Sequence, residues 1–212
     1  MEFSAQDLGL ADYETSLSLQ RELAKDISLG KRASTLLFCE HNPVITLGRL
    51  ADKKNILIPD KELKERGITI RNVTRGGDVT LHLPGQLVVY PIFDLRLLGR
   101  DLHSFLRGLE RAAVLLLRSY GIGAETKSGL TGVWSGNKKI ASIGIAVSHW
   151  IAYHGMSINV ACDLNLFSLI RPCGQDIMMT SILNENAAEA PDMGAVKKRA
   201  ADKFYEVFCS GG

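Results

Sequence analysis

Residues 71–98, RNVTRGGDVTLHLPGQLVVYPIFDLRLL, constrain the fold most, because turn residues divide them into short strand-like runs. Gly76-Gly77 separates the first run from the second, and Pro84-Gly85 separates the second from the third. Runs of about four to eight β-favouring residues between such turns are typical of consecutive strands. The middle of the chain therefore predicts a β-sheet.

Helical patterns flank this strand-rich region. Residues 101–123 form the clearest pattern, because apolar residues recur at helical spacing up to a Tyr-Gly pair; those residues are Phe105, Leu109, Ala112, Ala113 and Leu116. Residues 12–30 predict a helix that is capped by Gly30. Residues 54–70 predict a short helix that leads into a strand, and residues 194–209 predict an amphipathic helix.

Two further regions add strands to the predicted sheet. Residues 34–40, STLLFCE, read as a buried strand, and Gly136-Asn137 lies between two β-favouring runs as in a hairpin. Helices therefore lie on either side of a block of strands, without strict strand–helix alternation. This order predicts an α+β fold with a mixed β-sheet flanked by helices, in a single domain over residues 1–212.

The composition excludes several classes of protein. With 46% hydrophobic and 23% charged residues, the chain has the composition of a folded globular protein. A net charge of +2 is too balanced to predict nucleic-acid binding, and no apolar run reaches the roughly 18–20 residues that a membrane span needs. The acidic start carries no signal or transit pattern, so we expect a cytoplasmic protein, and we expect a monomer.

The cysteines indicate free thiols. Cys39, Cys162, Cys173 and Cys209 are irregularly spaced and include no CxxC pair, so neither a metal site nor a disulfide framework is predicted. Cys173 differs from the rest because Pro172 restricts the chain before it and Gly174 frees the chain after it. Such a turn suits an exposed nucleophile, but a free cysteine is also a common core residue. The local pattern leaves both readings open.

A lysine and a glycine pair are the other candidate site residues. Strand alternation places Lys139 on the face of Ala141 and Ile143, so its amine either extends to solvent or is partly buried. Gly76-Gly77 lets the backbone approach a ligand closely, although a plain hairpin turn explains the pair equally well. Neither a GxGxxG nor a Walker pattern is present, so no phosphate site is implied.

His82 shares a predicted strand face with Thr80, opposite Val79, Leu81 and Leu83. A lone strand histidine is more often structural than catalytic, so this residue alone does not define a site.

Three blocks together resemble the octanoyltransferases of lipoate biosynthesis, also called lipoyl(octanoyl) transferases. They are RGGDVTLHLPGQ, GVWSGNKKIASIGIAVSHWIAYHGMSIN and IRPCGQDIMMTS, and the resemblance extends over about residues 10–185. Many family members read TYHGPG where this chain has TLHLPG. Residues 175–179, QDIMM, also depart from the family pattern, and the resemblance assigns them no role.

The resemblance implies the fold of the biotin and lipoate protein ligases and a set of site residues. It implies that Cys173 is the acyl-enzyme nucleophile and that Lys139 is its partner. The implied substrate-binding residues are Arg75, Gly76, Gly77, Asp78, Val79, Thr80, Leu81, His82, Ser142, Ile143, Gly144, Gly155, Met156 and Ser157. We add the hypothesis that backbone N–H groups of Gly76-Gly77 and of residues 142–144 stabilise the oxyanion.

The implied reaction moves an octanoyl group from octanoyl-acyl carrier protein to a lysine of a lipoyl domain, through a Cys173 thioester. The implied acceptors are the lipoyl domains of 2-oxoacid dehydrogenase complexes and the glycine cleavage H protein. No ATP, metal or other cofactor is expected. Cations in the loops could attract acidic partners, or form an ordinary solvated surface; they are Arg49, Lys53, Lys54, Arg71, Arg75 and Arg100.

Three alternatives stay open from the sequence. An ATP-dependent lipoate–protein ligase of the same superfamily would need an adenylate-binding lysine and would not need Cys173. A non-catalytic lipoyl-domain-binding protein would need neither Cys173 nor Lys139. An amidotransferase between lipoyl domains would use the same cysteine and lysine chemistry.

Overall fold

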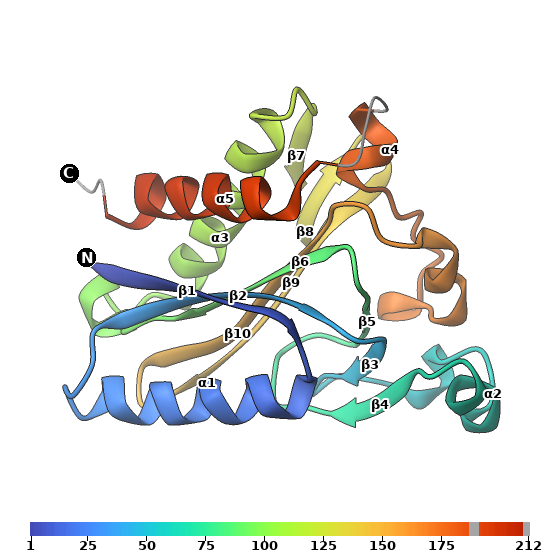
Figure 1. Cartoon of the computed structure of the whole chain (residues 1–212), viewed down its shortest axis with the longest axis horizontal. Helices are drawn as coiled ribbons and strands as arrows, with labels where there is room; N and C mark the ends of the chain where they lie inside the picture. The colour runs from blue at the N-terminus through green and yellow to red at the C-terminus, as the bar shows by residue number, and fades with distance from the viewer. Residues whose placement is uncertain (187–190, 210–212) are drawn as a thin grey trace.

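A computed structural model describes residues 1–186 and 191–209, and its centre is a mixed seven-stranded sheet (Figure 1). The strand order is β1-β2-β6-β10-β9-β8-β7; only β1 and β2 pair in parallel within this sheet. The strands are β1 (Phe3–Ala11), β2 (Ser34–His41), β6 (Gln86–Ile92), β7 (Ala124–Lys127), β8 (Leu130–Ser135), β9 (Lys138–Ser148) and β10 (Ile151–Asn159).

Helices cover both faces of this sheet. Helix α1 (Tyr13–Ser28) lies on one face, and α3 (Leu102–Arg118) and α5 (Met193–Phe208) lie together on the other (Figure 1). Strand β2 shows why its sequence is continuously apolar: Leu36 and Phe38 pack under α3 and α5, whereas Leu37 and Cys39 pack under α1. Because both faces of this strand are buried, its sequence does not alternate between apolar and polar residues.

A second, three-stranded sheet lies beside the first. Its order is β4-β3-β5, with β3 (Val44–Leu47) parallel to β4 (Thr69–Asn72) and antiparallel to β5 (Val79–His82). This small sheet and helix α2 (Asp60–Glu65) enclose a separate apolar cluster that includes Ile45, Leu63 and Leu81. The two sheets thus have distinct cores.

Local sequence signals account for the ends of the main elements. The Asp12 carboxylate accepts a hydrogen bond from Thr15 N at 2.9 Å and begins α1, and Gly30 follows the helix with a φ of 69°. Asp101 caps α3 in the same way. Gly136, with a φ of 54°, and Asn137 form the predicted two-residue turn between β8 and β9.

The α+β class with a mixed sheet and flanking helices is confirmed. The sequence patterns did not predict β1, β3 or β7. Strand β1 is largely exposed at the edge of the sheet and contains a bulge between Asp7 and Leu10, so it shows no clear alternation. Within the described part of the chain, no helix combines the length and the apolarity that crossing a membrane requires.

Candidate active site

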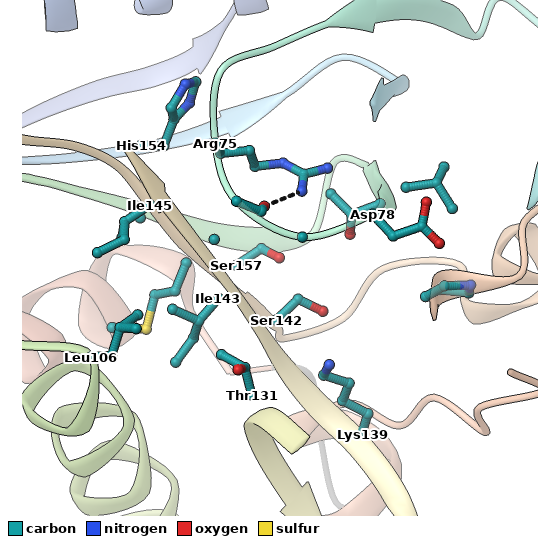
Figure 2. A pocket seen from close by; sticks show the side chains of 18 of the residues that line it. Arg75, Asp78, Leu106, Thr131, Lys139, Ser142, Ile143, Ile145, His154 and Ser157 are labelled. Atoms are coloured by element: carbon teal, nitrogen blue, oxygen red, sulfur yellow. Dashed lines mark hydrogen bonds between the residues drawn. The ribbon is translucent and has the colours of Figure 1, made fainter. Parts of the chain in front are cut away.

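A cavity of about 550 Å³ lies between the Gly76-Gly77 loop, strands β9 and β10, and the start of α3. Its volume falls within the roughly 300–1,000 Å³ that is usual for small-molecule sites. Lys139 lines it, as do all the predicted substrate-binding residues except Leu81. Segments that are far apart in the sequence therefore converge on one cavity (Figure 2).

Two predicted residues need separate comment. Leu81 is fully buried in the apolar cluster of the small sheet, because strand alternation turns it away from Thr80 and His82. The backbone of Cys173 lies in a short 3₁₀ turn, Pro172–Gly174, in which Gly174 has a φ of 65°. The Cys173 side chain lies outside the described part of the structure. Pro172 and Gln175, on either side of it, line the cavity.

Arg75 fastens the glycine loop to the small sheet. Its guanidinium is buried and donates hydrogen bonds to Thr46 O and Thr46 Oγ1, each at 2.8 Å. The sequence suggested that Arg75 could be an exposed cation that attracts acidic partners. Its burial shows that this expectation is wrong. Arg71 forms an ion pair with Glu14 at 2.8 Å.

The glycine loop also binds the large sheet. Gly76 N donates to Ile145 O at 2.8 Å, so this N–H is occupied and Gly77 N–H is left as the oxyanion candidate of the pair. A Cβ added at Gly144 would lie 3.0 Å from Gly76 O, and one added at Gly48 would overlap Gly77 O. Glycine is required at these positions because two backbones approach each other without side chains between them.

Lys139 extends from the start of β9 toward the cavity (Figure 2). Its Nζ lies 5.4 Å from the centroid of the Trp134 ring, within the range of a cation–π contact. The side chain also lies against Gly132, whose φ is 124°. The lysine is half-buried and is held by β8, the neighbouring strand.

Asp78 joins the glycine loop to the loop after β3. Its Oδ2 accepts from Asn55 Nδ2 at 2.5 Å, and its Oδ1 accepts from Asp52 N at 3.2 Å. Asn55 O in turn accepts from Arg171 N at 2.8 Å, directly before the turn that carries Cys173. Asp78 thus supports the Cys173 turn through Asn55.

The other end of the cavity is apolar. Figure 2 shows Leu106 and Ile145 on one side of the cavity, away from Lys139 and Asp78. Leu106 and Leu102 come from the first turns of α3, and Leu130 comes from β8. The sequence did not identify these leucines as site residues, because nothing in their local pattern distinguishes them from other apolar positions.

Buried histidines line the polar side. Burial lowers the pKa of His154 to about 3, with a further contribution from the nearby Arg75 charge, and lowers the pKa of His82 well below its ordinary value. Both rings are therefore neutral near pH 7. Within residues 1–186 and 191–209, His82 Nδ1 has no hydrogen-bond partner, so it is available to a ligand.

Protonation of His154 in the unfolded chain predicts acid sensitivity. Because the folded pKa lies below the unfolded value of about 6.5, the unfolded state binds more protons, and stability is lost as the pH falls below about 6.5. Between pH 7 and pH 5 the free energy of unfolding should fall by about 2 kcal/mol from His154 alone. Denaturant titrations of the wild type and of His154→Asn measure this difference.

Asparagine tolerates the left-handed backbone of position 154, where φ is 59°, and does not titrate. His154→Asn should therefore lose less stability over the same pH interval. If the free energy of unfolding depended equally on pH in the two proteins, the lowered pKa of His154 would be contradicted.

No three of the described histidine, cysteine, aspartate or glutamate side chains are grouped in a way that could hold a metal ion.

Comparisons with known proteins agree with this arrangement. The sequence model of the lipoyl protein ligase A/B catalytic domain matches residues 12–205, which defines the class of this domain. The octanoyltransferase of Desulfovibrio desulfuricans is 39% identical over 207 residues, covering 97% of this chain and 87% of the relative. The chain belongs to the octanoyltransferase family and is an acyltransferase.

Solved structures extend the likeness at the level of the fold. A lipoate-protein ligase A bound with ATP has a TM-score of 0.73 and 18% identity, over 99% of this chain and 86% of that one. The apo biotin protein ligase of Aquifex aeolicus has a TM-score of 0.57 and 14% identity, over 97% and 69%. The predicted biotin and lipoate ligase-like fold is confirmed.

Proposed function

We propose that this enzyme transfers an octanoyl group from an acyl carrier protein to a lysine of a lipoyl domain, through a Cys173 thioester. One observation carries the proposal: the cavity is apolar at the Leu106 end, and its other end holds Lys139 beside the turn of Cys173. An eight-carbon chain in the apolar end would have its carbonyl carbon near these two residues.

The first half-reaction exchanges one thioester for another. The Cys173 thiolate attacks the carbonyl carbon, and the carrier thiolate leaves and takes the proton of the Lys139 ammonium, which leaves Lys139 as a neutral amine. A neighbouring cation favours a thiolate, and Lys139 is the cation at this end of the cavity. Burial raises the pKa of Cys39 and of Cys162 to about 12, so neither thiol competes as a nucleophile near pH 7.

The second half-reaction forms an amide. The ε-amine of the acceptor lysine must lose a proton before it attacks the Cys173 thioester, and Lys139 accepts that proton. The sulfur of Cys173 leaves as a thiolate, the second proton of the amine goes to water, and the enzyme is regenerated with a cationic Lys139. Amide formation from a thioester is downhill, so the reaction needs no ATP, metal or other cofactor.

Both substrates are carried on proteins, so the mouth of the cavity must accept protein domains. Arg49, Lys53 and Lys54 are exposed in the loop after β3, which Asp78 ties to the glycine loop. This placement supports electrostatic attraction of acidic carrier and lipoyl domains. We propose that the enzyme acts as a cytoplasmic monomer.

An ATP-dependent ligase is the second candidate, because a lipoate-protein ligase A with bound ATP shares the fold. The experiment supplies a lipoyl domain with either octanoyl-acyl carrier protein or free octanoate plus ATP and Mg²⁺, and follows the mass of the intact proteins. Octanoylation from the carrier without ATP, with one octanoyl group on the enzyme, is expected. Octanoylation only from octanoate and ATP would establish the ligase instead.

The apolar end of the cavity should set the preferred acyl chain length. Leu106→Phe fills space there and should lower the kcat/KM ratio of octanoyl to hexanoyl transfer by about tenfold, since each methylene is worth roughly 1–3 kcal/mol in a fitted pocket. Competition between hexanoyl and octanoyl carriers measures the ratio. Leu97→Phe is the matched control, because Leu97 is 64% exposed and is not a lining residue. Equal ratios for Leu106→Phe and wild type would contradict the prediction.

A further inference from the structure

The segment after Cys173 pairs with Lys139 through one isolated β-bridge. Lys139 N donates to Met178 O at 2.8 Å, and Thr180 N donates to Lys139 O at 2.9 Å, which forms a parallel bridge between Lys139 and Met179. Both backbone groups of Lys139 are therefore bonded to the chain that leads away from the Cys173 turn. Residues 175–179, to which the family resemblance assigns no role, connect the Cys173 turn to Lys139.

Buried amides fix the end of this segment. Asn159 Nδ2 donates to Thr180 O at 2.9 Å, and Gln86 Nε2 donates to Asn159 Oδ1 at 2.9 Å. All three residues are buried, so these bonds are not exchanged with water. The carbonyl of Thr180 is held by β10 and, through Gln86, by β6.

A carboxylate then joins the segment to the β8–β9 hairpin. Glu185, in helix α4 (Ile182–Asn186), accepts hydrogen bonds from Thr180 Oγ1 at 2.7 Å, from Ser135 Oγ at 2.7 Å and from Lys138 Nζ at 3.0 Å. Ser135 and Lys138 flank the hairpin turn, and Lys138 precedes Lys139. We name Glu185, Thr180, Ser135 and Lys138 the Glu185 clamp.

The Cys173 turn itself has weaker attachments. Within it, Gly174 N and Gln175 N donate to carbonyls only three residues earlier. The ion pair between Arg171 and Asp176 is exposed, and such pairs contribute little. The firm attachments are the bond from Arg171 N to Asn55 O before the turn and, after it, the main-chain bonds to Lys139, the bond from Asn159 to Thr180 O and the Glu185 clamp.

We propose that Glu185 is a positioning residue, which sets the separation of Cys173 and Lys139 by fixing the end of the Cys173 segment to the hairpin that carries Lys139. Glu185 does not line the cavity, so it acts through Thr180 and Lys138 rather than on the acyl group. The inference rests on the proposed roles of Cys173 and Lys139.

Two substitutions at Thr180 give a matched test. Thr180→Val keeps the shape but removes the hydroxyl that Glu185 accepts, whereas Thr180→Ser keeps the hydroxyl. We expect Thr180→Val and Glu185→Ala to lower the single-turnover rate constant of Cys173 acylation at least tenfold, because small displacements of reacting groups have large effects on rate. Thr180→Ser should remain within about twofold of the wild type.

The pH profile of Cys173 alkylation by iodoacetamide separates positioning from general damage. If the clamp holds Lys139 near the thiol, the midpoint of the alkylation profile should move to higher pH in Thr180→Val and Glu185→Ala. The midpoint should stay in place in Thr180→Ser. Thermal melts set an assay temperature at which each protein is folded. Wild-type acylation rates and midpoints in both Thr180→Val and Glu185→Ala would overturn the proposal.

Failure of the proposed function has a different signature. Wild-type enzyme that forms no octanoyl-enzyme would refute the acyl-transfer mechanism. The alkylation midpoints would still decide whether the clamp holds Lys139 beside the Cys173 thiol. An unchanged midpoint in Thr180→Val would then count against the clamp by itself.

Discussion

Cys173→Ser should abolish the octanoyl-enzyme and lower octanoyl transfer at least ~10³-fold, because a serine hydroxyl is a far weaker nucleophile than a thiolate. The other cysteines cannot replace it. Cys39 and Cys162 are held by burial at a pKa of about 12, and burial also raises the pKa of Cys209. Intact mass after incubation with octanoyl-acyl carrier protein measures the intermediate.

Cys209→Ser is the control for this experiment, since Cys209 follows α5 and is not a lining residue of the cavity. It should acylate at the wild-type rate. Peptide mapping after brief alkylation at pH 7 should find Cys173 labelled before the other three cysteines. Full transfer activity in Cys173→Ser would rule out the acyl-enzyme route.

Gly132→Ala should have the second largest effect, although residue 132 is not a lining residue of the cavity. The added Cβ would lie 2.5 Å from Lys139 Cε and 2.6 Å from Ala141 O, at a φ of 124° that disfavours alanine. Lys139 must move, and a displacement of about 1 Å lowers kcat by roughly 100-fold. Single-turnover acylation, together with a thermal melt, measures both consequences.

Gly121→Ala separates backbone strain from displacement of the lysine. Gly121 also has a positive φ, 75°, but no atom lies within 4 Å of an added Cβ. Its melting temperature should fall slightly while its acylation rate stays at the wild-type value. An equal loss of activity in the two alanine variants would mean that strain, and not Lys139, is the cause.

The elements that the sequence predicted well are those whose signals are local. Helix α3 has an apolar stripe and an aspartate cap, and the β8–β9 turn has Gly136-Asn137 between two apolar runs. Strand β1 could not be found this way. It is a strand because β2 supplies its hydrogen bonds, and its own side chains are largely exposed.

The same distinction between local signals and tertiary contacts applies to the site. The family blocks identified the residues that surround the glycine loop and Lys139, because these residues lie close together in the sequence. Leu102 and Leu106 line the cavity only because α3 packs across the sheet, and no local pattern distinguishes them from other stripe residues. The family resemblance placed Leu81 in the site because it lies within the RGGDVTLHLPGQ block. Strand alternation instead points its side chain into the apolar cluster of the small sheet.

The close backbone approaches at Gly144 and Gly155 fix the wall of the cavity that β9 and β10 form. The backbone of this wall cannot shift without separating the strands, and side chains such as Ile143 and Met156 complete its surface. The opposite wall is made of side chains from α3 and β8, at Leu102, Leu106 and Leu130. Substitutions at these leucines can therefore change the width of the cavity without moving the glycine backbone on the opposite side.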